Sequence, residues 1–102
     1  MSDKIPQMNV HQPTVDLILC AYPEGIPNAH YLTLLSILAK DMSIRVLAAV
    51  IAHIRGGHYA VYMTDVVEAK RYTPAPGVAV TVKNKLLECG YEDWLVEADS
   101  PI

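Results

Sequence analysis

The chain has 102 residues, of which 52% are hydrophobic and 19% are charged, a composition typical of one globular domain and unlike that of a disordered chain. Its formal net charge of −3 provides no general attraction to nucleic acid or to an anionic membrane. No signal-peptide core is visible in residues 1–10, and the longest apolar run, Val46–Ala52, is too short to span a bilayer. We therefore expect one cytoplasmic domain.

The first helix is predicted to follow a flexible N-terminal tail, residues 1–11, which lacks apolar periodicity. Pro13 is suited to the first turn of a helix, where its missing N–H costs nothing. An apolar face then follows at helical spacing, made by Val15, Ile18, Leu19 and Tyr22. The run Tyr22–Pro27 holds two prolines and a glycine, so it is predicted to end this helix in a stiff corner.

Two further helices are predicted from capping residues and periodicity. Asn28 is placed as the N-cap of a helix that runs to about Asp41, with one apolar face made by Tyr31, Leu34, Leu35 and Leu38. Ser43 is predicted to cap the third helix, and Gly56-Gly57 to end it. The apolar face of that helix is Leu47, Val50, Ile51 and Ile54.

The second half of the chain is predicted to contain two more helices. The segment His58–Met63 alternates weakly, but no second strand exists to pair with it, so we interpret it as a loop. Asp65 and Glu68 have the spacing of a capping box, which predicts a short helix over residues 64–71. Pro76 is predicted to open a last helix that ends at Gly90.

We expect Trp94 and Leu95 to fold back onto the bundle. The predicted fold is therefore all-α, a single compact bundle of about five short helices over residues 12–95. A C-terminal tail, residues 96–102, is predicted to follow it.

Chemically reactive residues show no pattern of an active site. Cys20 and Cys89 lack a CxxC motif and a neighbouring cation, so both are interpreted as free, reduced thiols in the core. The four histidines do not have the spacing of metal ligands, and no phosphate-binding glycine loop or nucleophile motif occurs. We therefore predict no enzymatic activity, no catalytic residues, no metal and no cofactor.

A helix-turn-helix over residues 64–90 is the alternative interpretation, because the two predicted helices have suitable lengths and an intervening turn. Its DNA contacts would come from Lys70, Arg71, Lys83 and Lys85. The first turns of the second helix, Pro76–Val80, offer almost no hydrogen-bonding side chains for reading bases. We therefore favour a partner other than nucleic acid.

The run Tyr22–Pro27, followed by a tyrosine and a leucine pair within residues 30–38, resembles the mycobacterial domain-of-unknown-function family numbered 3349. Asp65-Val66, a proline at 74 or 76, and Gly90-Tyr91 occupy places similar to later motifs of that family. His30 and Thr33 depart from the acidic and proline residues of the family pattern. The resemblance implies a small five-helix actinobacterial protein without known activity, cofactor or catalytic residues.

These observations predict a non-enzymatic protein that acts through protein–protein contacts. The partner is expected to be an unidentified protein, and neither a membrane nor a small molecule. Contact residues are predicted in two places: Glu24 in the corner 23–27, and Tyr59 and Tyr62 in the segment 59–63, because tyrosine and methionine are enriched at interfaces. The competing interpretation is that these side chains only cover the core.

Overall fold

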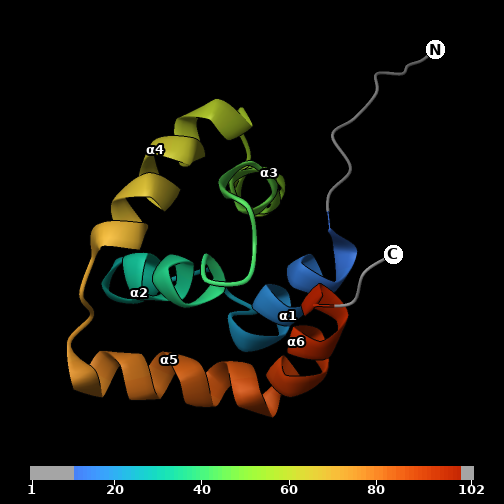
Figure 1. The fold of residues 1–102 in the computed structure, drawn as a ribbon, viewed down its shortest axis with the longest axis vertical. Helices are drawn as coiled ribbons and strands as arrows, with labels where there is room; N and C mark the ends of the chain where they lie inside the picture. The colour runs from blue at the N-terminus through green and yellow to red at the C-terminus, as the bar shows by residue number, and fades with distance from the viewer. Residues whose placement is uncertain (1–10, 100–102) are drawn as a thin grey trace.

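The structure is a computed structural model that describes residues 11–99, with side chains placed from residue 11 to residue 96. Every regular element in this part of the chain is a helix, which confirms the all-α prediction (Figure 1). Six helices are present instead of about five: α1 (Gln12–Ala21), α2 (Asn28–Leu38), α3 (Ile44–Arg55), α4 (Tyr59–Arg71), α5 (Pro76–Glu88) and α6 (Tyr91–Asp99). The predicted tail 1–11 lies outside the described residues except for His11.

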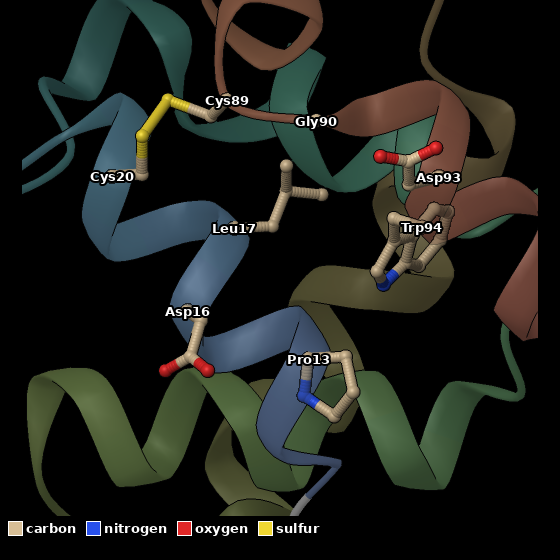
Figure 2. A pocket seen from close by; sticks show the side chains of 8 residues that line it. All are labelled: Pro13, Asp16, Leu17, Cys20, Cys89, Gly90, Asp93 and Trp94. Carbon is tan, nitrogen blue, oxygen red and sulfur yellow. A yellow bond between two sulfur atoms is a disulfide. The ribbon is translucent and has the colours of Figure 1, made fainter.

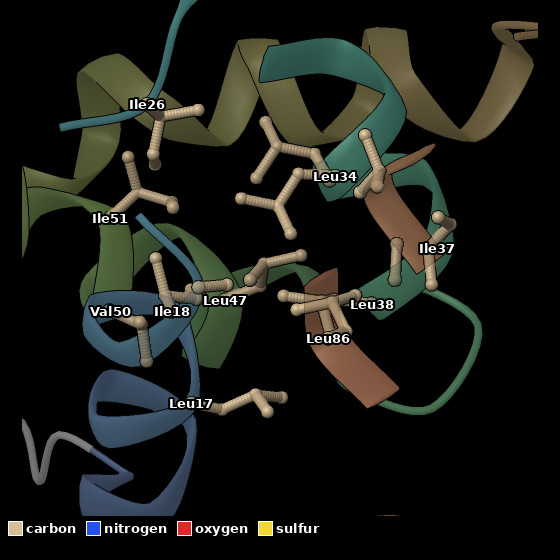
Figure 3. Close-up of a cluster of buried hydrophobic side chains, with 14 of the residues drawn as sticks. Leu17, Ile18, Ile26, Leu34, Ile37, Leu38, Leu47, Val50, Ile51 and Leu86 are labelled. Carbon is tan, nitrogen blue, oxygen red and sulfur yellow. The ribbon is translucent and has the colours of Figure 1, made fainter. Parts of the chain in front are cut away.

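Helix α2 is the central element of the fold. It packs against α4 and α5, and Figure 1 shows it between these two helices. Because it has neighbours on several sides, its buried residues form no narrow stripe: Thr33, Leu34, Leu35, Ile37 and Leu38. Side chains from α1, α2, α3 and α5 converge in the core beside it (Figure 3), where Leu38, Leu47 and Leu86 are fully buried.

Several predicted helix boundaries are confirmed. The Oγ atom of Ser43 accepts a hydrogen bond from the backbone N–H of Val46 at 3.2 Å, as expected of an N-cap. Helix α3 ends before Gly56, whose φ of 88° lies in the region that favours glycine. Pro76 is the first residue of α5, as predicted.

The boundaries of α2 differ from the prediction. Asn28 is its first helical residue, and Pro27 is the N-cap, so the asparagine side chain does not cap the helix. Proline at this place has an extended conformation (φ −64°, ψ 147°) that leads into the first turn without a side-chain cap. The helix ends at Leu38, earlier than the predicted end near Asp41.

The largest correction concerns His58–Met63, which was interpreted as a loop but forms the N-cap and the first turns of α4. His58 is the N-cap, and its Nδ1 atom accepts a hydrogen bond from the N–H of Ala60 at 3.1 Å. The apolar side chains on the inner face of α4 have helical spacing, namely Tyr59, Tyr62, Met63 and Val66. The predicted capping box is wrong because Asp65 and Glu68 both lie inside the helix.

Helix α6 is the element that the prediction lacked. Trp94 does fold back onto the bundle, where it is 3% exposed and stacks on Tyr91 with ring centroids 5.7 Å apart. Its Nε1 atom donates a buried hydrogen bond to Oγ1 of Thr14 in α1 at 2.8 Å. Because α6 continues to Asp99, the predicted start of the C-terminal tail at residue 96 is too early.

Candidate functional site

The predicted protein-contact residues lie on two separate elements. Glu24 is exposed in the corner between α1 and α2, whereas Tyr59 and Tyr62 are half-buried in the first turns of α4. The hydroxyl of Tyr62 donates to the carbonyl oxygen of Gly56 at 2.7 Å, and both tyrosines pack against the core. These contacts favour the interpretation that the two tyrosines cover the core. The neighbouring Val61 is 64% exposed.

The basic residues of the DNA-binding alternative are not gathered on a helix-turn-helix. Lys70 and Arg71 are exposed at the end of α4, and Lys83 is exposed on α5. Lys85 is half-buried, and its Nζ atom lies 5.5 Å from the centre of the Tyr22 ring. The main packing partners of α4 are α2 and α3, whereas those of α5 are α1 and α2. A helix-turn-helix packs its two helices together, so the observed packing gives the alternative no support.

Two hydrogen-bonded polar clusters join the helices. The hydroxyl of Tyr22 lies 3.0 Å from Nδ1 of His30, and burial raises the pKa of Tyr22 above its ordinary value. The hydroxyl of Tyr31 donates to Oδ2 of Asp65 at 2.7 Å, and the Arg55 guanidinium carbon lies 4.5 Å from the Tyr31 ring centre. The pKa of Tyr31 is raised, chiefly by burial and then by Asp65. The second cluster joins α2 to α3 and α4, and the first joins the end of α1 to α2.

The prediction that both cysteines are free core thiols is wrong, because Cys20 and Cys89 form a disulfide with a Cα–Cα distance of 5.9 Å. Cys20 is exposed, since α1 turns Leu17, Ile18 and Ala21 toward the core and leaves position 20 outside that face. Cys89 is half-buried at the C-cap of α5. No local pattern in the sequence marked the pairing, because the two cysteines are 69 residues apart in the chain.

A groove of about 500 Å³ lies beside this disulfide, between α1 and the junction of α5 and α6. We call it the disulfide groove. Figure 2 shows Leu17 on one side, Trp94 on the other and the disulfide at one end. The carboxylates of Asp16 and Asp93 also line the groove, and its lining residues include no basic side chain: Pro13, Asp16, Leu17, Cys20, Cys89, Gly90, Asp93 and Trp94.

Comparisons of the chain with protein-family models, with curated proteins and with solved structures gave no match. Within residues 11–99, no helix combines the length and the apolar character needed to cross a bilayer. The same part of the chain contains no group of three or more His, Cys, Asp or Glu residues arranged to hold a metal ion.

Proposed function

We propose that this chain is a non-enzymatic helical domain that acts by binding another protein, and that α5 is its main contact helix. The observation behind this proposal is a row of uncharged, exposed residues on α5, namely Val80, Asn84 and Leu87. We call it the outer row of α5. Val80 is 59% exposed and Leu87 is 41% exposed.

The outer row lies on one face of the helix because its residues are spaced i, i+4 and i+7. The opposite face of α5 packs on the core, because Val82 and Leu86 on that face are fully buried. A helix that packs on the core with one face and exposes Val80 and Leu87 on the other has the form of a helix that docks into a partner's groove. Lys83 flanks the row and would lie at the polar rim of such a contact.

Isolated exposed apolar residues are common on protein surfaces, so the experiment must separate a contact face from an ordinary one. A photo-crosslinking residue is placed at Val80 of the full chain in the native host cells, with a matched control at Arg45, which is exposed on α3. We expect one defined crosslinked protein from position 80 and none from position 45. Val80→Asp combined with Leu87→Asp should then abolish the complex and leave the helical circular-dichroism spectrum unchanged.

Equal crosslinking from positions 80 and 45, or a complex that survives the double aspartate variant, would refute the role of α5. Duplex DNA is titrated in parallel because Lys83 belongs to the DNA-binding alternative. Salt-dependent binding of DNA that falls on Lys83→Gln would favour that alternative.

We further propose that the chain is related to the mycobacterial family of unknown function numbered 3349 and that it works in the cytoplasm. The relation is supported by the run Tyr22–Pro27 and by the helical residues 30–38.

Disulfides in cytoplasmic proteins are usually transient or redox-sensing, so a cytoplasmic location makes the state of Cys20 and Cys89 dependent on cellular thiols. Fractionation of expressing cells tests the location, and recovery of the chain in the medium would contradict it.

A further inference from the structure

The Cys20–Cys89 disulfide has two properties that distinguish it from a buried structural crosslink. One of its cysteines is exposed, and it forms one end of an open groove. Exposed disulfides are, as a class, the ones that exchange readily with external thiols. We propose that this disulfide is a thiol–disulfide exchange site, in which a thiol that enters the disulfide groove attacks Sγ of Cys20 and releases Cys89. The proposal does not depend on the protein-binding function of α5.

The choice of Cys20 as the attacked residue follows from access. Cys20 is exposed at the end of α1, whereas Cys89 is half-buried where α5 meets α6. Thiol exchange requires the incoming sulfur to reach the attacked sulfur, so the exposed cysteine is favoured. The disulfide groove supplies a space of about 500 Å³ that borders the bond. Figure 2 shows the side chains that line this space together with the disulfide.

The departing group is the thiolate of Cys89, which is the C-cap residue of α5. Lys85 lies one turn earlier in the chain, but its Nζ atom lies 5.5 Å from the centre of the Tyr22 ring. The proposal therefore assigns no role to Lys85, and Cys89 leaves as a thiolate that takes its proton from solvent.

The exchange proceeds in two steps. The thiolate of a first external thiol forms a bond to Sγ of Cys20 while the Cys20–Cys89 bond breaks, and Cys89 takes a proton from solvent. A second external thiol, in the same molecule or in another, attacks the mixed disulfide at its external sulfur. Cys20 is released as a thiol, and the two external thiols are oxidised to a disulfide.

The carboxylates of the groove restrict which thiols react. Asp16 and Asp93 both line the space through which the thiol approaches, and the lining residues include no basic side chain. Like charges repel, so a reagent that carries an extra carboxylate is disfavoured in a groove lined by two carboxylates. We infer that the natural reductant presents its thiol on an uncharged or cationic surface.

The test uses the full oxidised chain without denaturant, and two small thiols of similar size: cysteamine, which carries an ammonium group, and 3-mercaptopropionate, which carries a carboxylate. The reaction is quenched with acid, and free thiols and mixed disulfides are mapped by mass spectrometry. We expect a rate proportional to thiol concentration, and the mixed disulfide on Cys20 with Cys89 free. After correction for thiolate fraction, cysteamine should react about tenfold faster at low salt.

Variants identify the residues responsible. Asp16→Asn combined with Asp93→Asn should bring the two corrected rates within about twofold of each other, whereas the control Glu68→Gln on the exposed side of α4 should leave their ratio unchanged. A rate independent of thiol concentration, which would mean that the chain must first unfold, refutes the proposal. So does a mixed disulfide found mainly on Cys89.

Discussion

Removal of the Cys20–Cys89 disulfide is predicted to lower the free energy of unfolding by about 4 kcal/mol. The perturbation is the double substitution Cys20→Ala with Cys89→Ala. The bond joins positions 69 residues apart, and the loop-closure entropy for that length corresponds to about 4 kcal/mol at 25 °C. Loss of side-chain packing adds little, because Cys20 is exposed and Cys89 is only half-buried. The effect is large beside a total stability of about 5–15 kcal/mol for a domain of this kind.

The assay is urea unfolding of the oxidised wild type and of the double variant, followed by circular dichroism. The reduced wild type is the control, because it lacks the bond and keeps both sulfur atoms. We expect the reduced protein and the double variant to have similar midpoints, both far below that of the oxidised protein. A loss of less than about 1 kcal/mol would refute the entropic argument, since it would mean that the unlinked denatured chain is already compact.

Three further predictions concern single side chains. Thr33→Val should stabilise the protein by about 1 kcal/mol in urea unfolding, because the Thr33 hydroxyl is buried without a hydrogen-bond partner; a loss of stability would mean that the hydroxyl is satisfied. Trp94→Phe should cost about 2 kcal/mol through the lost hydrogen bond to Thr14 and the smaller ring, and no loss would show that α6 is not docked as described. The raised pKa of Tyr31 means that the folded state holds the phenol proton more tightly than the unfolded state does, so stability should fall as pH rises above about 10. Tyr31→Phe should flatten this alkaline decline, and an identical decline in the variant would contradict the assignment.

The sequence predicted those features that depend on local chemistry. Ser43 caps its helix, Gly56 follows the end of α3, and Pro76 opens α5, because each residue type favours a backbone geometry irrespective of its surroundings. The all-α class follows from apolar residues at helical spacing, a pattern that packing reinforces. Helix caps, helix ends and apolar periodicity each depend only on residues that are close together in the sequence.

The features that the sequence did not predict depend on contacts between distant segments. Asp65 was assigned to a cap from its spacing with Glu68, but its hydrogen-bond partner is Tyr31 on another helix. The disulfide joins Cys20 to Cys89, which are 69 residues apart in the sequence, so no local pattern marks it. The disulfide groove exists only because α6 packs against α1, and it was invisible in the sequence for the same reason.

The hydrogen bond between Trp94 and Thr14 also makes the shape of the disulfide groove depend on the docking of α6. It joins the last helix to the first turn of α1, two elements that are far apart in the chain but lie side by side in the fold (Figure 1). Detachment of α6 would therefore remove Trp94 and Asp93 from the wall of the groove while the disulfide continued to join α1 to the end of α5.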